Sequence, residues 1–481
     1  MNVLLLVVDS LRAAALGSGP GRPATPFLDS LQGKSERFGR AYATECWTLP
    51  AHCSMFTGLL PSQHGAHFQT MALSDRAPTV AELLAREGHH TEVVTRNFIF
   101  DGTIPGVTRG FQENTPVLSN YGRFHPWALF LALSKPRFRR LVRKSGFFHP
   151  FQRESRRFMS TFARTLMPAD EPLLDYTLGR MDELRRRRKP FFLFCNLYDV
   201  HAPYPPSPRS ILRPLRSPSA LVENVLFPFA MQSLGAHTYL REGFRLGDAS
   251  RQLLLSRYHA AIELMDGKLE RFCSAAENAG LLDDTLLIVT SDHGEGFGEH
   301  GLYLHDASAY ETHLHVPLWI RHPERPAGST DDVVSTRDLF GLMCAAGRGE
   351  GWRDTLLDAD YRAAHPVALA EHFYYPHAAW IAPRYKCNLR AAIAAERKVV
   401  VRGDRVERYD LARDPDELAP EGGSLADFES DCRRIGLGRR PLAAAMSHLR
   451  ASVVPTRAVI EPRFPEVTSR PSPRLAGARV P

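Results

Sequence analysis

Residues 2–9 read NVLLLVVD, a run of apolar and partly β-branched side chains that ends in an aspartate. A run of this length without polar alternation is typical of a strand in the middle of a sheet whose two faces are both covered. In such sheets, ligands gather at the carboxyl ends of the strands. The sequence therefore predicts a buried central strand over residues 2–8, with Asp9 at the end of the sheet that carries function.

Further buried strands are predicted from similar runs downstream, at residues 91–95, 190–197, 285–290 and 316–320. Polar side chains follow two of these runs. Asp199 and His201 come after the run PFFLFCNL, and Asp292 and His293 come after TLLIVT. Several predicted strands thus place acidic or imidazole groups at their carboxyl ends.

Helical patterns separate these strands. Thr25 and Pro26 resemble an N-cap and a first-turn proline, which predicts a helix over residues 26–31. Thr79 and Glu82 have the spacing of a capping box, and residues 250–279 have helical periodicity. Alternating strands and helices indicate an α/β fold on a mostly parallel sheet.

The sequence pattern changes after about residue 352. Residues 398–401 and 405–409 resemble short antiparallel strands, and the stretch from about residue 460 is rich in proline and arginine. We predict a catalytic α/β domain over residues 1–352. Residues 353–481 would form a small C-terminal α+β subdomain that ends in a disordered tail.

Composition supports a globular protein with a large core. Of the 481 residues, 44% are hydrophobic and 23% are charged, and the net charge is +7. Arginine supplies 53 of the 60 basic residues, because only seven lysines are present. A GC-rich genome explains this bias, but arginine also binds oxyanions through two hydrogen bonds. Basic runs at 137–144 and 185–189 belong to no known nucleic-acid module, so no nucleic-acid partner is predicted.

Cysteine usage and the N-terminus favour a cytoplasmic protein. The seven cysteines are odd in number and form no C-x-x-C pair, which indicates reduced thiols rather than a disulfide framework. The N-terminal apolar run lacks the charged start and small-residue cleavage site of a signal peptide. Residues 127–144 mix aromatic, aliphatic and arginine side chains, so they could contact a membrane surface or form a lid.

The polar residues at the strand ends suggest metal chemistry. Asp9, Asp292 and His293 can hold a divalent cation. Thr48 lies in a polar turn, residues 48–52, before a helical stretch at 53–60. A cation lowers the pKa of a neighbouring hydroxyl group and makes it a nucleophile. Together these residues predict attack on a tetrahedral oxyanion ester.

Four segments resemble the sulfatase branch of the alkaline phosphatase superfamily. They are NVLLLVVDSLR (2–12), TPFLDSL with FGRAYATECWTLPAHCSMFTGLLPSQHG (25–31 and 38–65), LLIVTSDHGEGFGEHGLYLHDASAYETHLHVPLWIR (286–321) and ERYDLARDPDEL (407–418). The resemblance implies an alkaline-phosphatase-like three-layer α/β/α sandwich with a small C-terminal α+β subdomain. It also implies that Asp9, Thr48, Asp292 and His293 bind the metal.

This chain departs from the sulfatase pattern at four of these positions. Thr48 stands where sulfatases have a cysteine or serine that becomes formylglycine, and threonine cannot form that aldehyde. Ser10 replaces a second aspartate, His293 replaces an asparagine, and His52 replaces an arginine. The resulting ligand set favours Mn or Zn over Ca or Mg.

The resemblance also implies site roles for two further histidines. The sequence DVHAPY (199–204) resembles the family's P-H-x-P-Y segment, which makes His201 and His305 candidates for protonating the leaving group or contacting the oxyanion. His52 could also hydrogen-bond Thr48 or the oxyanion. Alternatively, His201 and His305 would join Asp199 in a second metal site.

We therefore expect a metal-dependent hydrolase that acts on an anionic sulfate or phosphate ester, with Thr48 as the nucleophile and phosphoester or phosphodiester cleavage favoured. One alternative is a phosphotransferase of the phosphoglycerol or phosphoethanolamine type with an envelope or lipid acceptor. Another is a non-catalytic binding protein on the same fold. The natural substrate and the oligomeric state stay open.

Overall fold

The computed structural model describes residues 1–17, 19, 21–116, 170–202, 204, 245–305, 307–374 and 385–451. The predictions of a membrane-contacting segment at 127–144 and of a disordered tail from residue 460 lie outside the described residues. Two compact units are distinguished, residues 1–451 and 452–481, and only the first contains described residues.

An eight-stranded sheet forms the centre of the fold, in the order β10-β2-β9-β6-β1-β5-β3-β4. The predicted strand at residues 2–8 is confirmed as β1, which lies between β6 and β5 and is parallel to both. Only β9 runs antiparallel to its two neighbours, β2 and β6, so the sheet is mostly parallel. The strands are β1 (Asn2–Val8), β2 (Glu36–Tyr42), β3 (His90–Thr95), β4 (Glu113–Pro116), β5 (Phe191–Leu197), β6 (Thr285–Thr290), β9 (His315–Arg321) and β10 (Gly328–Ser335).

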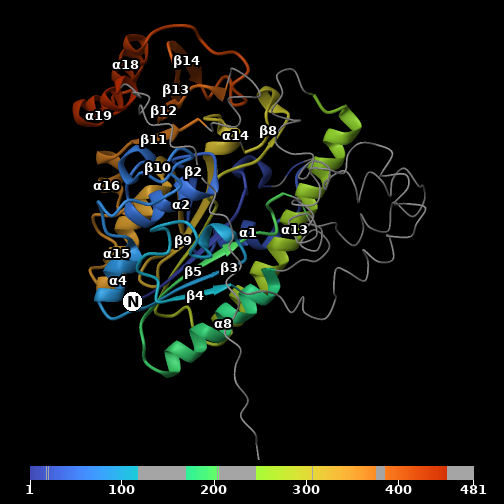
Figure 1. Cartoon of the computed structure of the whole chain (residues 1–481), viewed down its shortest axis with the longest axis vertical. Coiled ribbons are helices and arrows are strands. Elements are labelled where there is room, and N and C mark those ends of the chain that lie inside the picture. Colours follow the sequence, from blue (N-terminus) through green and yellow to red (C-terminus); the bar gives the residue numbers. More distant parts are fainter. Residues whose placement is uncertain are drawn as a thin grey trace, which may run out of the picture. The chain divides into compact units, whose positions relative to one another are not determined.

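Both faces of this sheet are covered by helices (Figure 1). Alternate residues of β1 point to opposite faces, and both sets are apolar and fully buried. Leu4, Leu6 and Val8 join the core beneath α1 (Pro26–Leu31), α8 (Asp170–Arg186) and α13 (Asp248–Asn278). Val3, Leu5 and Val7 join the core beneath α2 (Thr48–Thr57), α4 (Val80–Arg86) and α15 (Leu339–Arg348). The predicted three-layer α/β/α sandwich is confirmed.

A second, antiparallel sheet is built from residues after the predicted boundary at 352. Its strands are β11 (Val367–His372), β12 (Leu389–Ala394), β13 (Arg397–Arg402) and β14 (Arg405–Asp410). Helices α18 (Leu425–Arg434) and α19 (Arg439–Arg450) pack their apolar faces on this sheet through Phe428, Leu442 and Leu449. These elements match the predicted α+β subdomain.

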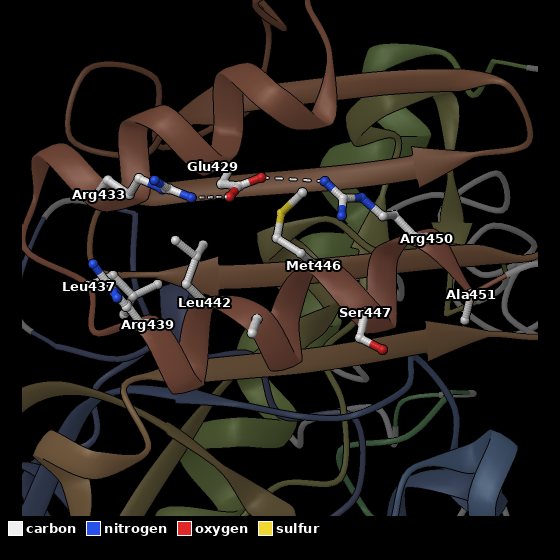
Figure 2. A pocket seen from close by; sticks show the side chains of 10 residues that line it. Glu429, Arg433, Leu437, Arg439, Leu442, Met446, Ser447, Arg450 and Ala451 are labelled. Atoms are coloured by element: carbon white, nitrogen blue, oxygen red, sulfur yellow. Dashed lines mark hydrogen bonds and ion pairs between the residues drawn. The ribbon is translucent and has the colours of Figure 1, made fainter.

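A cavity of about 840 Å³ lies between α18 and α19 (Figure 2). Three arginines line it, Arg433, Arg439 and Arg450, of which Arg433 and Arg450 pair with Glu429 at 2.6 and 3.4 Å. The cavity contains none of the predicted catalytic or metal-binding residues. Glu429 thus offsets part of the positive charge of these arginines.

The remaining elements are short. They are α3 (Pro61–His64), α14 (Glu311–Leu314), α16 (Ala359–Ala364), the two-stranded pair β7 (Gly296–Phe297) and β8 (Tyr303–Leu304), and 3-10 turns at Ala13–Ala15, Phe98–Phe100, Glu299–Gly301 and Thr336–Asp338. No helix in the described ranges is both long enough and apolar enough to cross a membrane.

One prediction about a helix start needs correction. The capping box of Thr79 and Glu82 is confirmed, and so is the helix over residues 26–31, with Thr25 at the N-cap position although its side chain makes no cap hydrogen bond. The predicted turn at 48–52 is instead the first half of α2, which begins at Thr48. Pro50 is tolerated there because the first-turn N–H groups of a helix have no intrahelical acceptor.

Candidate active site

Three predicted metal ligands meet at the carboxyl ends of neighbouring strands. Asp9 follows β1 directly, and Asp292 and His293 follow β6 after one intervening residue. Because β1 and β6 are parallel and hydrogen-bonded to each other, their ends lie at the same edge of the sheet. One donor atom from each residue lies within 4.8 Å of the other two, and all three side chains are completely buried. The structure thus brings this part of the predicted site together.

Thr48 reaches the same point from a different element. It is the first residue of α2, and its Oγ1 lies 3.4 Å from Nε2 of His293. The positive end of the helix dipole and the free N–H groups of the first turn favour negative charge at this position. Thr48 is only 5% exposed, so its hydroxyl lies inside the site rather than on an open surface.

The chemistry of these groups fits a divalent cation. Nδ1 of His293 lies 2.9 Å from the carbonyl oxygen of Gly294, to which it can donate, so Nε2 is available as a ligand. Oδ2 of Asp292 is buried and has no hydrogen-bond partner among the described residues. Burial and the neighbouring carboxylate of Asp9 raise the pKa of Asp292 well above its ordinary value. Two buried carboxylates this close are stabilised when a cation lies between them.

Ser10, which replaces the family's second aspartate, orients the two carboxylates. Its backbone is in the left-handed region, with φ of 65°. There its N–H donates to Oδ1 of Asp292 at 3.2 Å, and its hydroxyl donates to Oδ1 of Asp9 at 3.1 Å. Asn97 donates to Oδ2 of Asp9 at 3.2 Å. These contacts fix the carboxylates through second-layer hydrogen bonds.

His52 lies beside the proposed metal ligands, with its Nδ1 3.6 Å from Oδ2 of Asp292. Its Nδ1 lies 2.8 Å from the main-chain oxygen of Thr48, and its ring packs against Phe100 and Phe194. The side chain is completely buried, and burial lowers the pKa of His52 to about 4. The geometry links His52 to Thr48 through the backbone oxygen. Contact with an oxyanion stays a prediction.

His201 and His305 lie close to the proposed metal ligands. The ring of His305 is centred 4.5 Å from that of His293 and 4.9 Å from that of His201. Nδ1 of His305 lies 3.0 Å from Oε1 of Glu295, whose other oxygen accepts a hydrogen bond from Tyr204 at 2.9 Å. The buried Glu295 therefore orients His305. Sequence reasoning missed Glu295, although it lies only two residues after His293.

The carboxylate of Asp199 forms ion pairs with two buried cations. Its Oδ2 lies 2.5 Å from Nζ of Lys268, and its Oδ1 lies 3.0 Å from Nη2 of Arg96. All three side chains are less than 10% exposed. This pairing argues against Asp199 as a ligand of a second metal. Lys268 was missed, although a lysine among the apolar residues of a long helix is a recognisable signal.

A three-layer α/β/α fold with carboxylates and an imidazole at its strand ends, and a hydroxyl in the first turn of a helix beside them, defines a class of ester-cleaving enzymes. Within this class the chain belongs to the sulfatase family, because residues 1–346 match the family model named Sulfatase. Members of this family generally use a divalent metal ion, which agrees with the candidate ligands present here.

Curated relatives carry the names of ester hydrolases. Iduronate 2-sulfatase of Homo sapiens is 24% identical over 347 residues, which are 68% of this chain and 60% of the relative. Choline-sulfatase of Rhizobium meliloti (strain 1021) is 24% identical over 443 residues, which are 86% of this chain and 83% of the relative. The chain thus spans less than two thirds of the human enzyme.

Solved structures with the same fold include two phosphonate monoester hydrolases. The enzyme of Agrobacterium radiobacter has a TM-score of 0.59 and 21% identity, over 93% of this chain and 97% of that one. The enzyme of Silicibacter pomeroyi has a TM-score of 0.62 and 18% identity, over 93% and 95%. At these identities the likeness confirms the alkaline-phosphatase-like fold.

Proposed function

We propose that this protein is a metal-dependent hydrolase of anionic esters, in which Thr48 is the nucleophile and phosphate or phosphonate esters are better substrates than sulfate esters. One observation carries the proposal. Thr48 Oγ1 lies at the start of α2, 3.4 Å from Nε2 of His293 and beside the buried carboxylates. The names of the phosphonate monoester hydrolases that share the fold agree with the phosphorus preference.

In this proposal Asp9, Asp292, His293 and Thr48 hold the metal, which agrees with the grouping of the first three side chains. When bound, a divalent cation would lower the pKa of the hydroxyl and offset charge on the ester oxygens. The first-turn N–H groups of α2 add to that stabilisation. His52 holds the main-chain oxygen of Thr48 and so fixes where the nucleophile lies.

The leaving group needs a proton. The hydroxyl of Thr48 releases its proton to solvent, its Oγ1 attacks phosphorus, the bond to the leaving oxygen breaks, and that oxygen takes a proton from His201 or His305. The carboxylate of Glu295 stabilises His305 in its protonated form, since it accepts from Nδ1 while Nε2 faces away from it. Water then attacks the phosphothreonine, with the deprotonated histidine as base.

Comparing four substrates on one protein tests this proposal. The purified chain, loaded with Mn or Zn, is assayed with an aryl phosphomonoester, phosphodiester, phosphonate and sulfate. We expect turnover of at least one phosphorus ester, its loss in Thr48→Ala, and its partial retention in Thr48→Ser, which keeps the hydroxyl. Full turnover in Thr48→Ala would exclude Thr48 as the nucleophile, and turnover of the sulfate alone would exclude the phosphorus preference.

A further inference from the structure

A second set of metal-binding side chains lies where the segment before α2 meets the second sheet. Glu45 and Cys46 belong to that segment, and His372 is the last residue of β11. One donor atom of each lies within 4.8 Å of the other two. The side chains are 1%, 0% and 2% exposed, respectively. None of these residues belongs to the donor set around Asp292.

The distances between the three side chains are close to those between ligands of one tetrahedral ion, although one of them is shorter. Nδ1 of His372 lies 2.9 Å from Oε1 of Glu45 and 3.7 Å from Sγ of Cys46. Ligand atoms at zinc–ligand distances of about 2.0–2.3 Å lie roughly 3.3–3.8 Å apart in a tetrahedron. The distance from His372 to Cys46 lies within this range, and the distance from His372 to Glu45 is shorter, as in a hydrogen bond. Small side-chain shifts would therefore place all three donors on one ion.

The second carboxylate oxygen of Glu45 is available as a further metal ligand. Its Oε2 is buried and has no hydrogen-bond partner among the described residues, where His372 is also its only ion-pair partner. A carboxylate that binds through both oxygens would supply four donor atoms from three residues. The N–H of Ser308 lies 3.5 Å from Sγ of Cys46, and such a contact stabilises a thiolate ligand.

We propose that Glu45, Cys46 and His372 form a second, structural site for a soft divalent cation of the zinc class. Thiolate, imidazole and carboxylate ligands are those that zinc prefers in proteins. The N–H of Glu371 already donates to the main-chain oxygen of Thr44 at 2.9 Å, so the two segments are in register beside the site. An ion there ties the segment that leads into Thr48 to β11. The inference goes beyond the proposed function, because it involves no catalytic residue.

Cobalt(II) distinguishes the two sites by spectroscopy, because only this one contains a thiolate. Metal-free full-length protein is titrated with cobalt(II) chloride, and the near-ultraviolet thiolate-to-cobalt charge-transfer band is recorded. We expect the band to saturate at one equivalent per chain, to persist in Asp292→Asn, and to disappear in Cys46→Ser. Cys387→Ser is the matched control, since Cys387 is the only half-buried cysteine in the described ranges, and it should keep the band.

Two further variants cover the case in which Cys46→Ser fails to fold. Glu45→Gln and His372→Gln should each weaken cobalt binding at this site at least tenfold, with the far-ultraviolet circular dichroism of wild type. No charge-transfer band in the wild type, or a band unchanged in Cys46→Ser, would overturn the proposal. An unchanged cobalt affinity in both Glu45→Gln and His372→Gln would also overturn it. The three side chains would then be only a hydrogen-bonded cluster that binds no metal.

Discussion

Replacing Asp199 by asparagine separates its two candidate roles, the buried ion pair and the ligand of a second metal. The carboxylate contacts Nζ of Lys268 at 2.5 Å and Nη2 of Arg96 at 3.0 Å, with side-chain exposures of 4%, 5% and 9%. Asparagine keeps the shape and removes the charge. If the carboxylate is a salt-bridge partner, Asp199→Asn is destabilising and leaves the metal content unchanged.

The size of the effect follows from the burial. At an effective dielectric constant of about 20, two unit charges roughly 3 Å apart attract by about 5 kcal/mol. The cost of removing the ions from water offsets much of this attraction. Deleting one partner leaves the buried ammonium group of Lys268 without its carboxylate, which costs about 3–5 kcal/mol. We expect the free energy of unfolding to fall by that amount.

Urea unfolding, followed by circular dichroism and tryptophan fluorescence, measures this loss, and elemental analysis counts the bound metal. The double variant Asp199→Leu with Lys268→Met should recover part of the stability, because it removes the buried ammonium group together with the carboxylate, while Arg96 still loses its contact with Asp199. A loss of one metal equivalent in Asp199→Asn, with stability unchanged, would refute the ion-pair role and restore the dimetal alternative.

Three other perturbations probe separate parts of the molecule. His52→Phe keeps the packing on Phe100 but removes the hydrogen bond to Thr48. We therefore expect kcat to fall by about 100-fold with KM little changed. A similar increase in KM would instead indicate that His52 contacts the substrate. Lys398→Met removes the cation that pairs with both Glu311 and Glu417. Urea unfolding should show that the free energy of unfolding falls by about 3–5 kcal/mol, and adding Glu417→Gln should reduce this loss. Although burial alone would raise it, hydrogen bonds from His90, Tyr176 and Arg180 lower the pKa of Glu92 from 4.5 to about 2. Its contribution to stability is therefore complete above pH 4.5 and lost as the pH falls toward 2, so the stability difference between wild type and Glu92→Gln should shrink over that range; a constant difference would contradict the assignment.

The parts of the site that lie at strand ends could be predicted from the sequence. The apolar runs of β1 and β6 are recognisable because both faces of each strand are buried, and each run stops where a polar residue begins. Asp9 and Asp292 follow from that rule alone. The role of Thr48 needed the family resemblance, because a hydroxyl before a helix is a common capping residue.

Pairings between distant segments could not be predicted. Lys268 meets Asp199 only because α13 crosses the face of the sheet beside β5, and no local pattern records that crossing. β2 was missed because its sequence, ERFGRAY, is polar and contains a glycine; its place between β9 and β10 makes it a strand. Tertiary context overrides local propensity in both cases.

On the proposed function, threonine at position 48 also decides how the reaction ends. A phosphothreonine carries no adjacent group that could expel the phosphate, so water must attack phosphorus opposite the threonine oxygen. That step needs a base on the side from which the leaving group departed, where the first step used an acid. A histidine that has just given up its proton satisfies both requirements, and the ring of His305 lies 4.5 Å from that of His293 and 4.9 Å from that of His201. Losing either one should therefore slow the second step as well as the first, which single-turnover kinetics with an activated aryl ester can separate.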